Sequence, residues 1–335
     1  MPKTRFPKLL LFLPVALWCL ATGTLLAQTE ETLRYQLTAP AGASPGLEGT
    51  LTLPANARKP VPVVLLIAGS GPVDRNGNAP PELGGPQMNM YRQLADSLTR
   101  RGVAVLRYDK RGSGQNRAAF LASALAKQPG NFDDNVTDAL GFIRQLQADK
   151  RFSTLTVAGH SEGALVGMLA VARSGVSRYV SIAGPGRNIA DILKTQFANG
   201  GVTGEAMNLA VGVLDSLRAG HTVRQPPFVL ARFFAPAAQP YLISWMKHDP
   251  TQAIRAIRGR VLILQGRRDI QVDVSEAALL KTARPDAEVV YFETMSHILK
   301  EAPADRAANM ATYTDPKLTI LPALADVIAA FVKRS

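Results

Sequence analysis

A serine flanked by two glycines lies between a predicted strand and a predicted helix. The segment Gly159-His160-Ser161-Glu162-Gly163 follows the apolar stretch 155–158 and precedes a helical pattern that begins at Ala164. A serine on such a turn is lifted above the sheet, and the glycines remove side chains that would collide with the strand and the helix. The pattern alone arises by chance in roughly one chain in ten of this length. Its position between strand and helix favours Ser161 as a nucleophile over a structural turn serine.

Histidine is the usual base for a serine nucleophile, and the chain has four histidines. His160 lies within the turn, where its side chain is expected to point away from the serine. His221 and His248 have no carboxylate at a suitable spacing and are expected at the surface. His297 follows the last predicted strand, 288–292, and so leaves the sheet at the edge that holds the serine. His297 is therefore the candidate base.

The base needs a carboxylate that orients its ring. Asp269 follows the predicted strand 261–265, which precedes the strand that leads to His297. Asp273, four residues later, is the weaker alternative. The candidate catalytic residues are therefore Ser161, Asp269 and His297, in that chain order.

Negative charge that develops on a carbonyl oxygen under attack needs two N–H donors. The backbone N–H of Glu162, directly after the nucleophile, is the first candidate. The second should come from the glycine-rich turn after the predicted strand 61–67, where Ser70 is the candidate donor and Gly71 the alternative. These glycines could instead serve only a tight turn. A phosphate-binding loop is disfavoured, because the segment lacks the lysine that such a loop carries after its glycines.

Strand and helix patterns alternate from residue 61 onward. The continuous apolar run 61–67 is typical of a strand buried on both faces. Such alternation predicts an α/β fold, in which right-handed crossovers place helices on both faces of a mostly parallel sheet. An alternating pattern at about 31–54 predicts an N-terminal β-hairpin, and 112–131 is expected to be a long connection. The predicted strands are 61–67, 103–108, 155–158, 179–183, 261–265 and 288–292, and the predicted helices are 88–101, 132–149, 164–173 and 321–333.

A long segment without a convincing strand, about 184–258, interrupts the alternation. It follows a predicted strand, so a right-handed crossover would bring its helices over the carboxyl edge of the sheet as a cap. Its aromatic residues could line a substrate pocket, and Phe233 and Trp245 are the candidate substrate-binding residues. Alternatively, these side chains form the cap's own core.

The first 27 residues have the pattern of a secretory signal peptide. Lys3, Arg5 and Lys8 precede an apolar run at 9–20, and small and polar residues follow up to Ala27. The expected domain is then 28–335, located in the periplasm or outside the cell, with no stable membrane anchor after cleavage. The run is shorter than a usual bilayer span of about 20 residues, which favours a cleaved signal peptide. An uncleaved N-terminal anchor is the alternative.

Composition excludes several other classes of protein. Cys19 is the only cysteine, which excludes an intramolecular disulfide framework and a zinc site made of cysteines. The net charge is +12, but the positive residues are scattered and only 6% of residues are aromatic, so no nucleic-acid partner is expected. No metal-ligand or nucleotide-binding spacing is present, and no metal or other cofactor is expected.

Several segments together resemble the serine-hydrolase branch of the α/β-hydrolase fold, and in particular the bacterial EstD-like esterases. They are 69–77, 107–114, 159–163 and 183–187, with Asp269 and His297. The resemblance implies cofactor-free ester hydrolysis, with the nucleophile, acid and base in the order found in that fold. Ala68, where many relatives have histidine, and Ala164, where glycine is frequent, depart from the pattern. Asp74, Arg75 and 109–111 are expected to tie loops together rather than to contact substrate.

The resulting hypothesis is a secreted or periplasmic carboxylesterase whose partner is a small-molecule acyl ester. A peptidase or an acyltransferase on the same fold is the alternative, because the sequence does not show what the cap admits. A non-catalytic binding protein on a hydrolase scaffold is a further alternative, which the complete set of Ser161, Asp269 and His297 disfavours.

Overall fold

The computed structural model describes residues 28–38, 45–55, 57, 59–226, 230–231 and 233–334. The predicted signal segment, residues 1–27, lies outside the described residues. Within the described part of the chain, no helix has the length and apolar character needed to cross a membrane.

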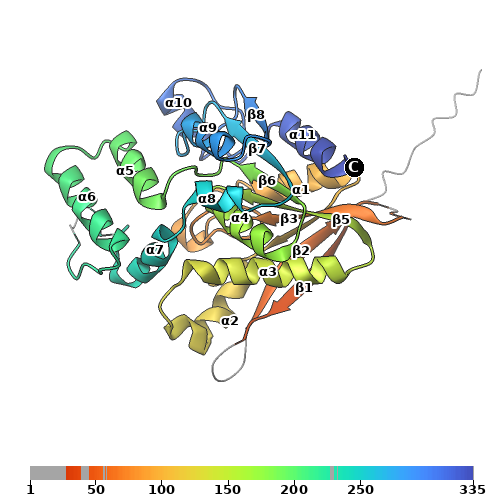
Figure 1. Cartoon of the computed structure of the whole chain (residues 1–335), viewed down its shortest axis with the longest axis horizontal. Coiled ribbons are helices and arrows are strands. Elements are labelled where there is room, and N and C mark those ends of the chain that lie inside the picture. The colour runs from red at the N-terminus through yellow and green to blue at the C-terminus, as the bar shows by residue number, and fades with distance from the viewer. Residues whose placement is uncertain are drawn as a thin grey trace, which may run out of the picture.

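The core of the molecule is one eight-stranded sheet with the strand order β1-β2-β4-β3-β5-β6-β7-β8 (Figure 1). Strand β2 pairs antiparallel with β1 and with β4, and the strands from β4 to β8 pair in parallel. The predicted mostly parallel sheet is therefore confirmed. The strands are β1 (Thr29–Gln36), β2 (Gly46–Leu53), β3 (Val61–Ile67), β4 (Ala104–Tyr108), β5 (Phe152–His160), β6 (Arg178–Ile182), β7 (Arg260–Gly266) and β8 (Glu288–Phe292).

Helices cover both faces of the sheet, as predicted. Helices α3 (Phe132–Ala148), α4 (Glu162–Ser174) and α9 (Val274–Ala283) pack on one face, and α1 (Met90–Arg100) and α11 (Pro322–Lys333) pack on the other. Strand β3 contributes Val63 and Leu65 to the first core and Val64 and Leu66 to the second. Successive side chains of a strand point to opposite faces, so a strand covered on both sides needs an unbroken apolar run.

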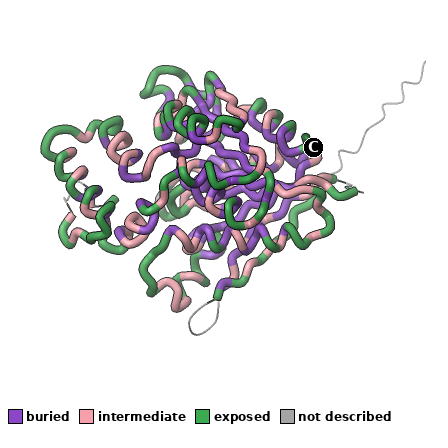
Figure 2. The backbone as a smooth tube through the Cα atoms, viewed as in Figure 1, coloured by how far each residue is buried: buried purple, intermediate pink, exposed green. Residues whose placement is uncertain are grey.

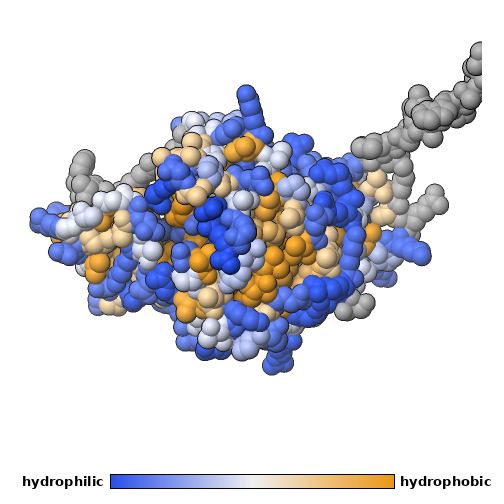
Figure 3. All heavy atoms as spheres, turned by 90° about the horizontal axis from the view of Figure 1, so that it is seen from above, coloured by the Kyte–Doolittle hydropathy of each residue, from blue (hydrophilic) through white to orange (hydrophobic). Residues whose placement is uncertain are grey.

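Burial is concentrated in the sheet and in the inner faces of these helices (Figure 2). The face seen from above has hydrophobic side chains near its middle, with hydrophilic side chains around them (Figure 3). The two buried clusters are separated by the sheet itself. The central strands therefore hold the carboxyl edge of the sheet, where the candidate residues lie, in a fixed position.

Some elements differ from the predicted boundaries. Strand β5 extends beyond the predicted 155–158, because backbone pairing with β3 continues to Phe152 past the apolar run. The stretch 112–131, expected to be a long connection, contains the short helices η2 (Gly114–Asn116), α2 (Arg117–Ala122) and η3 (Ala124–Lys127). Helix α10 (Arg306–Thr312) lies between β8 and α11.

In the described part of the segment expected to form a cap, between β6 and β7, lie four α-helices and the short 3-10 helix η5 (Pro236–Ala238). The α-helices are α5 (Ile189–Asn199), α6 (Gly204–Arg218), α7 (Gln239–Met246) and α8 (Pro250–Arg255). Helices α5, α6 and α7 project beyond one end of the sheet, whereas α8 leads back to β7 and packs beside α4 and α9 (Figure 1).

Candidate active site

Ser161 occupies a strained position between β5 and α4. Its φ of 55° lies in a region that side chains rarely adopt, with ψ at −121°. The two glycines explain how this turn is possible. A Cβ at Gly159 would collide with the carbonyl of Gly163, and a Cβ at Gly163 would collide with the carbonyl of Ile67. The backbone N–H of Ser161 donates to the carbonyl of Ile182 at 3.0 Å, which holds the turn against β6.

His297 and Asp269 lie next to each other at the same edge of the sheet. The Nδ1 atom of His297 is 2.8 Å from Oδ2 of Asp269, and both side chains are almost completely buried. The other carboxylate oxygen, Oδ1, accepts hydrogen bonds of 2.8 Å from the backbone N–H groups of Gln271 and Val272. A proton on Nδ1, shared with the carboxylate, leaves Nε2 unprotonated and able to act as a base.

The proposed oxyanion donors lie beside Ser161. Ser70, its alternative Gly71, and Glu162 line the same cavity as Ser161. Within the part of the chain that the structure describes, no oxygen accepts a hydrogen bond from the backbone N–H of Ser70 or of Glu162. Both N–H groups are therefore available to a ligand oxygen.

The cavity that Ser161 lines measures about 630 Å³. Phe233 and Trp245, the two residues predicted to bind substrate, both line it. Trp245 is 8% exposed and stacks on Phe132 with 5.3 Å between ring centroids, so it also belongs to the core. Phe233 is 55% exposed and lies at the rim. The apolar lining is completed by Pro72, Pro185, Ile189, Ile192, Leu193, Phe234, Ala238, Leu242 and Val272.

Comparison with known proteins supports the predicted fold. Residues 84–196 match the family model of serine aminopeptidase, S33. Est1E from Butyrivibrio proteoclasticus superposes with a TM-score of 0.54 at 14% identity, over 90% of this chain and 99% of that one. The esterase Pf2001 from Pyrococcus furiosus gives 0.53 at 16% identity, over 92% and 93%. This chain has the α/β-hydrolase fold.

A curated relative is consistent with the resemblance seen in the sequence. This chain is 26% identical over 257 residues to Esterase EstD of Thermotoga maritima, an alignment that covers 76% of this chain. The same alignment covers 58% of the relative, so the chain spans less than two thirds of that protein's length. The resemblance to EstD-like esterases is confirmed.

Asp273, the alternative acid, has a different place in the fold. It lies at the start of α9, where its side chain accepts a hydrogen bond of 2.9 Å from the backbone N–H of Ser275. Hydrogen bonds from Ser275 hold the pKa of Asp273 below its usual range. The structure therefore brings Asp269, and not Asp273, to His297.

The two histidines between β6 and β7 differ in their surroundings. His221 is exposed, as expected. The expectation that His248 is a surface residue without a carboxylate partner is wrong, because its Nε2 atom lies 3.2 Å from Asp133 and its side chain is mostly buried beside Phe132. Asp133 belongs to α3, far away in the sequence, and no local spacing could have revealed this pair.

The side chain of His160 joins the serine turn to Tyr91 of α1 and to the backbone of His297. Its Nδ1 atom is 2.8 Å from the hydroxyl of Tyr91, and that hydroxyl accepts the backbone N–H of Gly69 at 2.8 Å. Its Nε2 atom lies 2.9 Å from the carbonyl of His297. A carbonyl can only accept, so Nε2 carries the proton and Nδ1 accepts from Tyr91. Tyr91 thus supports the glycine-rich turn after β3, which carries the candidate donor Ser70. The sequence did not reveal this role beyond the departure at Ala68.

We expect the His160 ring to remain neutral, with its proton on Nε2, at pH 6.5, where ordinary histidine is about half protonated. Burial lowers the pKa of His160 well below its usual range, and the nearby His297 lowers it further. Nitrogen-15 NMR of the histidine rings measures both the charge and the tautomer, and a His160→Gln variant assigns the signals. Two protonated ring nitrogens at pH 6.5 would contradict the expectation.

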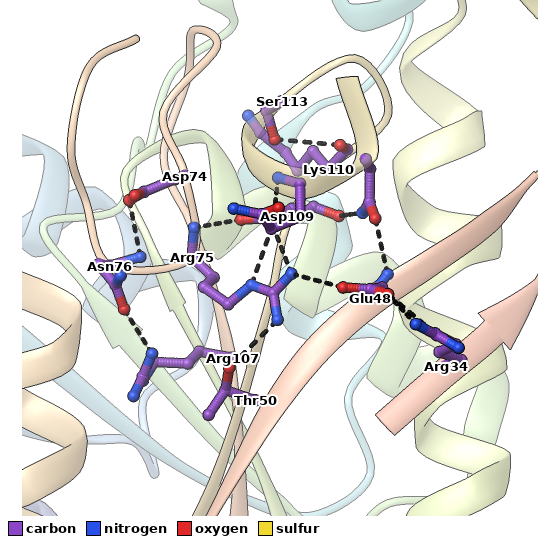
Figure 4. Close-up of polar contacts among 12 residues, drawn as sticks. Arg34, Glu48, Thr50, Asp74, Arg75, Asn76, Arg107, Asp109, Lys110 and Ser113 are labelled. Carbon is purple, nitrogen blue, oxygen red and sulfur yellow. Dashed lines mark hydrogen bonds and ion pairs between the residues drawn. The ribbon is translucent and has the colours of Figure 1, made fainter. Parts of the chain in front are cut away.

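Two of the segments that carried the resemblance, 69–77 and 107–114, are tied together by a buried ion pair (Figure 4). The carboxylate of Asp109 accepts two hydrogen bonds from the guanidinium of Arg75, at 2.6 and 2.9 Å, and one from its backbone N–H. The interpretation of these residues as loop ties is confirmed for this pair. Lys110 and Arg111, expected to serve only as ties, also line the cavity.

No metal site is evident in the parts of the chain that the structure describes. Among those residues, no group of three or more histidine, cysteine, aspartate or glutamate side chains could hold a metal ion.

Proposed function

We propose that this α/β-hydrolase is a carboxylesterase that cleaves small-molecule esters through an acyl-enzyme on Ser161. The observation that carries the proposal is the 2.8 Å contact between Asp269 and His297, at the sheet edge that also holds the strained serine turn. The available N–H groups of Ser70 and Glu162 and the apolar cavity support it.

The proposed reaction has two halves, formation of the acyl-enzyme and its hydrolysis, and His297 accepts and then donates one proton in each. The Ser161 hydroxyl oxygen bonds to the ester carbonyl carbon while Nε2 of His297 takes its proton, and the carbonyl oxygen becomes negatively charged. When the bond to the alcohol oxygen breaks, His297 gives the proton to that oxygen. Water then attacks the acyl-enzyme in the same way, which releases a carboxylic acid and restores the serine. Asp269 stabilises the imidazolium that forms in each half.

The test combines covalent labelling with a survey of substrates. A fluorophosphonate should label Ser161, as shown by peptide mass spectrometry, and p-nitrophenyl esters should be hydrolysed. An unlabelled serine in folded protein would favour a non-catalytic binding protein. Faster cleavage of amino-acid p-nitroanilides than of esters would favour the peptidase alternative, which the matched family description supports. Transfer of the acyl group to an added alcohol in preference to water would favour an acyltransferase.

The proposal extends to the place where the enzyme acts. The basic start, apolar run and small residues of segment 1–27 support secretion to the periplasm or beyond, with cleavage after Ala27. The mass of the protein recovered from that compartment tests this. A full-length mass in the membrane fraction would instead indicate a retained anchor.

Replacement of Phe233 by alanine is expected to lower kcat/KM for long acyl esters about fivefold and to leave short esters unchanged. Phe233 lies at the rim of the cavity, where only a long chain would reach it. Rates for C2 to C10 p-nitrophenyl esters measure the effect. Leu209→Ala is the control, because Leu209 is an exposed apolar residue of α6 that does not line the cavity. Equal losses for short and long esters would contradict this role.

A further inference from the structure

Lys110 contacts the carbonyl of Gly69 and the carboxylate of Glu162, and its side chain is only 10% exposed. It follows β4 in the loop that continues into η2, and it lines the same cavity as Ser161. Building on the proposed function, we propose that Lys110 is a positioning residue that orients the two N–H donors of Ser70 and Glu162.

The first contact fixes the direction of the Ser70 N–H. The ammonium group of Lys110 donates a hydrogen bond of 2.6 Å to the carbonyl of Gly69. That carbonyl and the N–H of Ser70 belong to one peptide group, and in a trans peptide the two bonds point in opposite directions. Holding the carbonyl toward Lys110 therefore holds the N–H on the other side. A charged donor also polarises the peptide group, which makes its N–H a stronger donor.

The second contact concerns the residue after the nucleophile. The ammonium group lies 3.1 Å from Oε1 of Glu162, whose side chain is 2% exposed. An unpaired carboxylate at this position would repel the negative charge that develops on the carbonyl oxygen of the substrate. Lys110 compensates that charge and holds the first residue of α4, which carries the other N–H donor.

Lys110 and Gly69 are themselves held in place. The carbonyl of Lys110 accepts hydrogen bonds from the backbone N–H of Ser113 at 3.1 Å and from its hydroxyl at 3.0 Å (Figure 4). The N–H of Gly69 donates to the hydroxyl of Tyr91 at 2.8 Å. Gly69 is thus bound from both sides, by Tyr91 at its N–H and by Lys110 at its carbonyl. Two opposed contacts restrict rotation of the loop more than either does alone.

Replacement of Lys110 by methionine keeps the length of the side chain and removes the ammonium group. We expect kcat to fall roughly 10- to 100-fold, with KM changed less than about twofold, because the donors act mainly on the transition state. A boronic acid that forms a tetrahedral adduct with Ser161 places an oxygen at the same donors. Its inhibition constant should therefore rise by about the same factor as kcat/KM falls.

A double variant separates this role from simple charge compensation. Lys110→Met/Glu162→Gln leaves no unpaired charge, so it also serves if the single variant does not fold. We expect its kcat to remain about tenfold below that of Glu162→Gln, because the Gly69 carbonyl still lacks its donor. Equal kcat values for these two variants would overturn the proposal. A fall in kcat of the single variant without weaker boronic acid binding would also overturn it.

A control variant and the wild-type protein distinguish a failure of this inference from a failure of the proposed function. Lys194→Met removes an ammonium group that pairs with Asp215 between α5 and α6, and it should leave kcat and boronic acid binding unchanged. If the wild type hydrolyses esters and Lys110→Met does so equally well, only the role of Lys110 is wrong. If the wild type neither hydrolyses esters nor binds the boronic acid, the proposed function itself fails.

Discussion

The Ser161→Ala variant is expected to lose ester hydrolysis by about six powers of ten in kcat, because the covalent path through the acyl-enzyme no longer exists. The remaining rate should be that of unassisted water attack in a site that still offers its N–H donors. Alanine keeps a Cβ at the strained φ of 55°, so the backbone of the turn and the thermal stability should change little.

Steady-state rates with a p-nitrophenyl ester and labelling by a fluorophosphonate measure this effect, and circular dichroism checks the fold. Ser216→Ala is the matched control, since Ser216 lies on α6, where its hydroxyl donates to the carbonyl of His221. The control should keep wild-type rates. Undiminished labelling or turnover in Ser161→Ala would show that another residue is the nucleophile.

The Asp269→Asn variant is expected to lose about three to four powers of ten in kcat. An asparagine amide can present its NH₂ group to Nδ1 of His297, which favours a neutral ring with its proton on Nε2. In that tautomer the ring cannot take the proton of Ser161. The backbone N–H groups of Gln271 and Val272 bind Oδ1 of Asp269, so they hold the side chain in the orientation that meets the ring.

Asp273→Asn makes the same chemical change four residues later and serves as the comparison. Asparagine caps a helix about as well as aspartate, so α9 should remain intact and activity should fall much less. Parallel kinetic and thermal-melt measurements on the two variants decide the assignment. A larger loss in Asp273→Asn would transfer the acid role to Asp273.

Much of the fold could be predicted because it depends on local patterns. The run 61–67 became β3 with the predicted boundaries, and 288–292 became β8. Both segments consist mainly of apolar residues, which pack in alternation against the hydrophobic clusters on the two faces of the sheet. The position of Ser161 was predictable for a related reason, since only glycines at 159 and 163 allow the strand and the helix to approach so closely.

The sequence by itself thus determined the element order, the sheet edge that carries the candidate residues and the turn that presents Ser161. Only the tertiary structure decided which side chains meet there. It placed Asp269 rather than Asp273 beside His297, joined Gly69 to Tyr91 and Lys110, and paired His248 with Asp133. Such contacts depend on where separate loops and helices lie in space, and a hydrogen bond forms or fails over a fraction of an ångström. Local sequence patterns do not specify the distances between side chains of separate loops and helices.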